Sequence, residues 1–297
     1  MVADRRFDFA RDLQLSGDLV AAEDLFVQAT DLAPGFATAW FTLGEVREQL
    51  GDRYGAIVAF RTAEMTDPGD RNGAGLRLMR LGASHIAGMR PTYVKALFDQ
   101  YAPRFEAALV DDLGYRGPAL LLAAVAIARA AAGRPLTFSR AIDLGCGTGL
   151  AARAFSPIVD EIIGIDLSPR MIERARATGL YAELEVAEIV KGLGGRPDGG
   201  ADLILAADVM AYVHDMTALL REVARVLAVG GLFAFTVESH AGEGVVLGEG
   251  LRYAYSGSCV RALVAAAGLV LDRLESASSR NESGVQVPGL VVVAAKA

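Results

Sequence analysis

The stretch SRAIDLGCGTGLAARAF, residues 139–155, decides the fold of this 297-residue chain. A short apolar segment runs into a turn that contains Gly145, Gly147 and Gly149, and an Ala-rich helical pattern follows it. Glycine tolerates positive φ angles and lets the backbone approach a ligand closely. The stretch therefore predicts a strand, a ligand-binding turn and a helix, which is the opening unit of an α/β domain.

Asp143 stands two residues before the first glycine, at the predicted carboxyl end of the strand, where open α/β sheets bind their ligands. A carboxylate there repels the pyrophosphate of a dinucleotide and attracts the ammonium group of a methionine moiety. The glycine spacing agrees, because Leu150 occupies the position where the dinucleotide pattern G-x-G-x-x-G needs its third glycine. The turn favours S-adenosylmethionine over NAD.

A second strand is predicted in EIIGIDLSP, residues 161–169, and it ends in Asp166, 21 residues after Gly145. An acidic side chain at such a strand tip accepts hydrogen bonds from two ribose hydroxyls, which makes Asp166 our candidate for that role. The competing structural role is to cap the helix that begins near Pro169. That role fits Ser168 better.

Together, AIDLGCGTG and GIDLSPRMIERAR resemble motifs I and II of class I S-adenosylmethionine-dependent methyltransferases. The resemblance implies a Rossmann-like seven-stranded sheet, with S-adenosyl-L-methionine as cofactor and S-adenosyl-L-homocysteine as product. It also implies that a third strand at 183–188 ends in Glu188, where the family usually carries an Asp that contacts adenine. The implied cofactor-binding residues are Tyr101, Asp143, Gly145, Gly147, Gly149, Asp166, Leu167, Met171, Glu188, Asp208, Val209 and Tyr212.

The rest of the chain continues this pattern. A fourth strand is predicted from Ala201, and residues 220–238 resemble the family's helix, glycine turn and fifth strand. Two more strands are expected around 269–276 and 290–295, as the family's sixth strand and its antiparallel seventh. Before the first of these, residues 250–269 lead into a helix for which we predict Ser258 as N-cap.

The segment before the glycine turn carries Phe98, Tyr101 and Phe105 on one predicted helix face, a spacing that core packing also explains. The pattern FDxYAxxF at 98–105 resembles the N-terminal lid of predicted bacterial methyltransferases with tetratricopeptide repeats. The resemblance implies that Tyr101 lies over the methionine part of the cofactor, where an aromatic face favours the sulfonium cation.

The N-terminal region repeats itself with a shift of 34 residues, which aligns Phe26 with Phe60 and Pro34 with Pro68. The repeated helix pairs resemble the tetratricopeptide repeat. We therefore expect an all-α repeat module over 1–85, a helical linker or lid over 86–135 and the methyltransferase domain over 136–297. The module either braces the enzyme, by solubilising or dimerising it, or offers a groove to a partner protein.

Methyl transfer from a sulfonium is an in-line displacement, so the protein chiefly aligns the acceptor and excludes water. If the acceptor is a hydroxyl or an amine, a side chain should accept its proton. We rank Glu238 and His240 first as catalytic candidates, because they lie at the predicted ligand-binding end of the fifth strand. Asp208, Tyr212 and His214 are the others. The acceptor is an unidentified small molecule or protein.

Composition limits the alternatives. The net charge is −7 without a dense Lys/Arg block, so nucleic acid is not an expected partner. Cys146 and Cys259 are too few and too distant for a disulfide framework or a zinc site, and no metal is expected. The apolar run at 119–128 is too short for a membrane span. The charged N-terminus lacks the apolar stretch of a secretion signal, which favours the cytoplasm.

Three competing functions follow from the same features. One is a regulatory or scaffold protein that binds S-adenosylmethionine without catalysis. Another is an NAD-dependent oxidoreductase, which the missing third glycine argues against. The last is an interaction protein with a vestigial Rossmann-like domain. The intact set of Asp143, three glycines and Asp166 argues against that loss of function.

Overall fold

A computed structural model describes residues 2–106 and 113–297, which form two compact units. The first comprises Met1–Ala96 together with Glu249–Leu251, and the second comprises Leu97–Gly248 and Arg252–Ala297. The division falls inside the helix α6 (Pro91–Tyr101). This division lies about one helix after the expected module boundary at residue 85, and the expected domain bounds stay a prediction.

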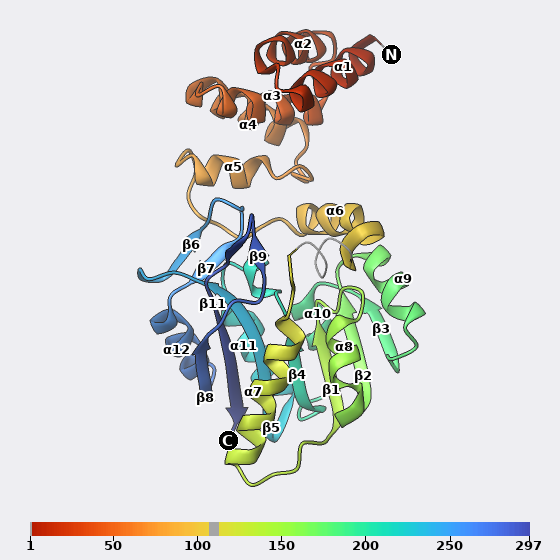
Figure 1. Cartoon of the computed structure of the whole chain (residues 1–297), viewed down its shortest axis with the longest axis vertical. Helices are drawn as coiled ribbons and strands as arrows, with labels where there is room; N and C mark the ends of the chain where they lie inside the picture. The colour runs from red at the N-terminus through yellow and green to blue at the C-terminus, as the bar shows by residue number, and fades with distance from the viewer. Residues whose placement is uncertain (1, 107–112) are drawn as a thin grey trace. The chain divides into compact units, whose positions relative to one another are not determined.

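The first unit is all-helical, and its local geometry repeats with the 34-residue period of the sequence. Asp18 and Asp52 each cap a helix by accepting a hydrogen bond from the amide three residues on, and Phe26 and Phe60 are both fully buried. The repetition is thus present in the structure, while the likeness to the tetratricopeptide repeat stays a prediction. The helices are α1 (Val2–Ser16), α2 (Leu19–Leu32), α3 (Ala37–Gln49), α4 (Arg53–Thr66) and α5 (Ala74–Arg80) (Figure 1).

The second unit is built on one sheet with the strand order β3-β2-β1-β4-β5-β11-β8. Strand β11 runs antiparallel to both of its neighbours, and the pairs from β3 to β5 are parallel. This confirms the expected seven strands and the antiparallel last one. Two short strands, β6 (Val245–Leu247) and β7 (Tyr253–Tyr255), are added beside the end of β5. The seven are β1 (Phe138–Leu144), β2 (Val159–Asp166), β3 (Glu183–Val186), β4 (Ala201–Ala206), β5 (Leu227–Ser239), β8 (Leu269–Ser276) and β11 (Gly289–Lys296).

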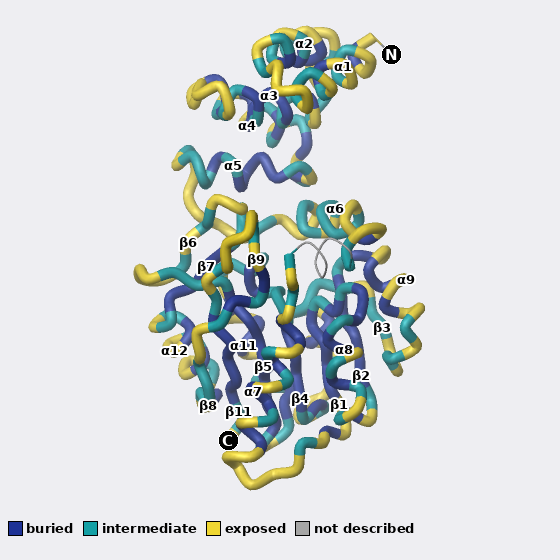
Figure 2. The backbone as a smooth tube through the Cα atoms, viewed as in Figure 1, coloured by how far each residue is buried: buried dark blue, intermediate teal, exposed yellow. Residues whose placement is uncertain are grey.

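Successive side chains of the central strands point to opposite faces of the sheet and contribute to two buried layers. Leu203 and Leu205 of β4, with Leu232 and Ala234 of β5, pack in one core with α7 and α8. The residues between them, such as Phe233, are also buried, and the central strands are dark blue in Figure 2. A parallel sheet covered on both faces directs its ligand site to the carboxyl ends of the strands. The helices are α7 (Gly117–Ala131), α8 (Leu150–Phe155), α9 (Pro169–Ala177), α10 (Ile189–Gly194), α11 (Thr217–Val226) and α12 (Gly257–Ala266).

Two helix caps test single-residue predictions. Ser168 caps α9 as expected, because its hydroxyl accepts the amide of Met171. The prediction of Ser258 for α12 is wrong, since Ser256 is the N-cap and accepts the amide of Cys259. Two serines stood two positions apart, and only the backbone path decides which one has the extended conformation of a cap. No described helix has the length and apolar character needed to cross a membrane.

Candidate functional site

The glycine turn between β1 and α8 has the backbone that the sequence predicted. Gly145, Gly147 and Gly149 all have positive φ, at 62°, 53° and 96°. A Cβ on Gly145 would lie 2.6 Å from Cγ2 of Val209, so a side chain there meets both an unfavourable backbone angle and a packed neighbour. Val209, expected at the cofactor cleft, therefore packs directly against the turn.

Asp166 lies at the tip of β2 and binds the turn from the side. Its Oδ2 accepts the amide of Gly147 at 2.9 Å, and its Oδ1 accepts the amide of Ser168 at 2.8 Å. Burial raises the pKa of this carboxyl above its usual value, although the backbone amides oppose that effect. Each carboxylate oxygen keeps a second lone pair, so the same group can still accept hydrogen bonds from ribose hydroxyls.

Asp143 is only 1% exposed at the carboxyl end of β1. Tyr181 donates its hydroxyl to Oδ2 at 2.7 Å, whereas Oδ1 is buried without a hydrogen-bond partner among the described residues. Burial raises the pKa of Asp143 to about 7, with Tyr181 opposing the shift and Asp166 adding to it. A buried acceptor oxygen without a partner is costly. Its place beside the glycine turn suits a bound cation with N–H donors, such as the ammonium of S-adenosylmethionine.

Residues 98–105, which precede α7 and β1 in the sequence, lie against the glycine turn and the start of α9. Asp99 accepts the hydroxyl of Ser168 at 2.5 Å, so α6 is joined to the start of α9. The ring of Phe98 lies edge-on to Tyr212 at 5.1 Å and to Phe105 at 6.2 Å. Phe105 in turn is the nearest side chain to the Cβ position of Gly147, at 3.7 Å. This segment therefore adjoins the turn, and Tyr212 belongs to the same aromatic cluster, while its role as a lid stays a prediction.

Several predicted cofactor residues have structural roles in this arrangement. Tyr101 is 39% exposed, with the guanidinium of Arg104 over its ring at 5.4 Å. Met171 is fully buried in α9, and Leu167 is half-buried. Glu188 follows β3, which ends at Val186, and caps α10 by accepting the amides of Val190 and Lys191. The assignment of these four residues to the cofactor stays a prediction.

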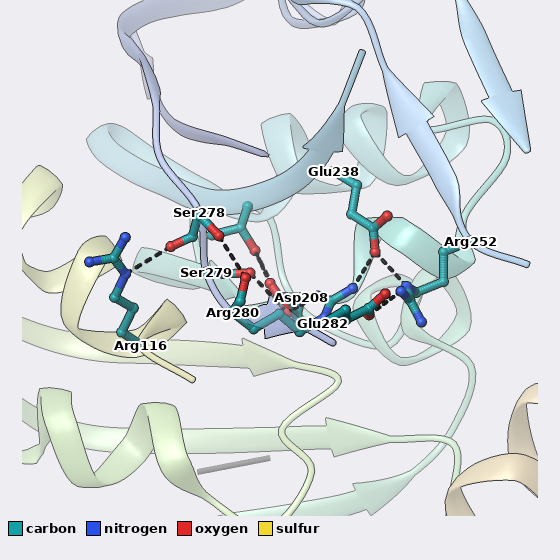
Figure 3. A network of polar contacts seen from close by, with 9 residues as sticks. Arg116, Asp208, Glu238, Arg252, Ser278, Ser279, Arg280 and Glu282 are labelled. Atoms are coloured by element: carbon teal, nitrogen blue, oxygen red, sulfur yellow. Dashed lines mark hydrogen bonds and ion pairs between the residues drawn. The ribbon is translucent and has the colours of Figure 1, made fainter. Parts of the chain in front are cut away.

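An ion cluster lies at the carboxyl ends of β4 and β5, and the sequence did not predict it. We call it the Arg280 cluster. Its members are Asp208, Glu238, Arg252, Arg280 and Glu282. Arg280 is only 6% exposed and donates to Asp208 at 2.5 Å, to Glu238 and to Glu282 at 3.2 Å. Arg252 joins Glu238 at 2.5 Å and also contacts Glu282. Figure 3 shows these side chains converging.

Charges in the Arg280 cluster support one another. Burial lowers the pKa of Arg280, but Asp208 and Glu238 outweigh burial, so the net pKa is raised and the guanidinium stays charged. Asp208 has a left-handed backbone, with φ of 57°, and its carboxylate is further held by the hydroxyls of Thr236 and Ser279 at 2.9 and 3.1 Å. These contacts fix the strand-end carboxylates rather than leaving them free to move.

Both catalytic candidates are engaged with other groups. Glu238 accepts from two arginines. The His240 ring closes its own turn, with Nδ1 accepting the amide of Gly242 at 3.1 Å and Nε2 3.2 Å from the carbonyl oxygen of Gly244. Tyr253 and Tyr255, the first and last residues of β7, are fully buried. Within residues 2–106 and 113–297, no three His, Cys, Asp or Glu side chains gather as a metal site.

Comparisons with known proteins cover the same region. A family model described as a methyltransferase domain matches residues 142–235. The ubiquinone biosynthesis O-methyltransferase of Xanthomonas oryzae pv. oryzae is 32% identical over 106 residues, which are 34% of this chain and 44% of that protein. The chain thus matches less than half the length of this curated relative.

Two solved structures share the fold. The cyclase SpnF has a TM-score of 0.54 at 20% identity, over 72% of this chain and 99% of that one. The 1,6-didemethyltoxoflavin-N1-methyltransferase of Burkholderia thailandensis, solved with S-adenosylhomocysteine, has a TM-score of 0.53 at 18% identity, over 72% of this chain and 92% of that one. Because one of these two proteins is named a cyclase and the other a methyltransferase, the shared fold by itself does not determine the reaction.

Proposed function

Because this chain carries a class I S-adenosylmethionine-dependent methyltransferase domain, we propose that it transfers the methyl group of S-adenosylmethionine to a hydroxyl oxygen of a small acceptor that is not an anion. The observation that carries the proposal is the pair of carboxylates that flank the glycine turn. Asp143 offers an oxygen that no described residue binds, and Asp166 holds Gly147 while each of its oxygens keeps a second lone pair.

In this proposal each part of the cofactor has a matching group. Asp143 binds the methionine ammonium, and Asp166 accepts hydrogen bonds from the ribose hydroxyls. The glycine turn lets the cofactor approach the backbone closely. The bound cofactor supplies an activated methyl group. The chain's own part is to hold the acceptor in line with it and to keep water out, which contributes on the order of 7 to 11 kcal/mol to the acceleration.

Calorimetric titration with S-adenosylmethionine, S-adenosylhomocysteine and NAD tests the cofactor assignment. We expect Asp166→Ala to weaken binding of the first two by about 1 to 3 kcal/mol, because hydrogen bonds to a charged group are lost. Asp160→Ala is the matched control, since Asp160 lies exposed on the same strand β2. Equal affinity in both variants would contradict the ribose role of Asp166, and binding of NAD alone would overturn the cofactor assignment.

The Arg280 cluster supports the acceptor part of the proposal. Its three carboxylates, Asp208, Glu238 and Glu282, face two arginines, which leaves an excess of one negative charge. A carboxylate or phosphate acceptor would be repelled there, whereas a neutral hydroxyl compound would not. The relative that is an O-methyltransferase supports oxygen as the methylated atom. Since Glu238 and His240 are already engaged, we propose that they shape the acceptor side, and that the methylated oxygen loses its proton to water after the transfer instead of to either side chain.

An assay of S-adenosylhomocysteine release with matched sets of small phenols, aromatic amines and aromatic carboxylic acids tests this class. We expect turnover within the phenol set and none with the carboxylic acids. Turnover confined to the carboxylic acids would overturn the acceptor class. If the protein binds S-adenosylmethionine and turns over no member of any set, the scaffold function without catalysis gains the support that the enzyme loses.

A further inference from the structure

Tyr181 lies in the connection between α9 and β3, in a slot that two glycines leave open. A Cβ on Gly164 of β2 would lie 2.8 Å from the tyrosine ring, and a Cβ on Gly149 would lie 3.3 Å from it. The ring also packs against the main sheet core and against the smaller core around Ile172. The position of the ring is therefore fixed by strand β2 on one side and by the glycine turn on the other.

This placement aims the tyrosine hydroxyl at the carboxylate beside the turn. The hydroxyl donates to Oδ2 of Asp143 at 2.7 Å, and the other carboxylate oxygen, Oδ1, has no partner among the described residues. One oxygen is thus held and the other is left for a ligand. Tyr181 and Asp166 shift the pKa of Asp143, and Asp143 in turn raises the pKa of two further neighbours, Cys146 and Tyr115.

None of the other three neighbours donates a hydrogen bond to Asp143 within the described residues. Asp166 is a like charge, and burial and then Asp143 raise the pKa of the Cys146 thiol, which therefore stays neutral. Burial and the carboxylates of Asp208 and Asp143 likewise raise the pKa of Tyr115. Within the part of the chain that the structure describes, Tyr181 supplies the hydrogen bond that favours the ionised form of Asp143.

We propose that Tyr181 is a positioning residue for the cofactor, which orients Asp143 and favours its carboxylate form, so that the free oxygen can bind the methionine ammonium. The inference rests on the proposed binding of S-adenosylmethionine. A protonated carboxyl attracts an ammonium group far less than a carboxylate does. Removal of the tyrosine hydroxyl therefore weakens cofactor binding most at the pH values where Asp143 regains its proton.

The test is the Tyr181→Phe variant of the full chain, titrated calorimetrically with S-adenosylhomocysteine at pH 6.5, 7.5 and 8.5. Phenylalanine keeps the ring in its slot and removes the hydroxyl alone. We expect about a tenfold loss of affinity at pH 6.5 and a clearly smaller loss at pH 8.5, because one unit of pKa corresponds to about tenfold in the protonation equilibrium. A purely structural role of Tyr181 would lower affinity by the same factor at every pH.

Two further variants make the outcome decisive. Tyr54→Phe, at an exposed tyrosine of the helical unit, should leave the affinity unchanged. In the double variant Asp143→Asn/Tyr181→Phe the pH dependence of the tyrosine effect should vanish relative to Asp143→Asn. Parallel pH curves for the wild type and Tyr181→Phe would overturn this inference alone. A wild type that binds neither S-adenosylmethionine nor S-adenosylhomocysteine would instead overturn the proposed function.

Discussion

Arg280→Met is expected to lower the free energy of unfolding by about 3 to 5 kcal/mol, the usual effect of removing one partner from a buried ion pair. Arg280 is 6% exposed, and it joins Asp208, which follows β4, to Glu238, near the end of β5. Methionine fills much of the same space but leaves these carboxylates without their shared cation. Urea denaturation followed by circular dichroism measures the change.

The matched control is Arg140→Met, because Arg140 pairs with Glu161 at the surface, with both side chains more than 40% exposed. A surface pair contributes about 0 to 1 kcal/mol, so this variant should hardly move the transition. The double variant Arg280→Met/Asp208→Asn should recover part of the lost stability, since it removes one of the stranded charges. Equal losses in Arg280→Met and Arg140→Met would show that the Arg280 cluster does not stabilise the fold.

The sheet could be predicted because its signals are local and periodic. Residues 161–166 carry three isoleucines and residues 269–276 begin with Leu-Val-Leu, compositions that predict strands, and the glycine turn fixes where the first strand ends. The structure confirms both runs as the strands β2 and β8, and it confirms the antiparallel pairing of β11. Asp143 and Asp166 were found for the same reason, since each occupies a fixed place at a strand end.

Tyr181 and Arg280 could not be predicted because their contacts join distant parts of the chain. Tyr181 reaches Asp143 across 38 residues, and Arg280 reaches Asp208 across 72. Neither lies in a periodic segment or a turn motif. The engagement of His240 with Gly242 and Gly244 is local, but it depends on a backbone turn that no residue type specifies in advance. Loop residues of this kind become visible only when the sheet brings them together.

Asp143→Asn is expected to stabilise the free protein at pH 8 while it weakens cofactor binding. The folded protein keeps a proton on Asp143 up to about pH 7, whereas the ordinary pKa of an exposed Asp is 3.8. Between these values the folded state holds the extra proton, so the free energy of unfolding falls as pH rises. At about 1.4 kcal/mol per pKa unit, the wild type loses roughly 2 to 3 kcal/mol between pH 5 and pH 8 through this group.

Asparagine carries no titrating proton, so its advantage over aspartate should grow by that same amount between pH 5 and pH 8, as urea denaturation at the two pH values would show. The amide cannot offer a negative charge to an ammonium group, and we expect S-adenosylhomocysteine to bind about 10- to 100-fold more weakly, since a hydrogen bond to a charged group contributes roughly 1.5 to 3 kcal/mol. Asp160→Asn, at an exposed position of β2, should change neither quantity. Stability and affinity that both fall in Asp143→Asn at pH 8 would mean that the buried carboxylate supports the fold, whereas opposite changes would mean that the fold tolerates an unfavourable charge because the ligand needs it.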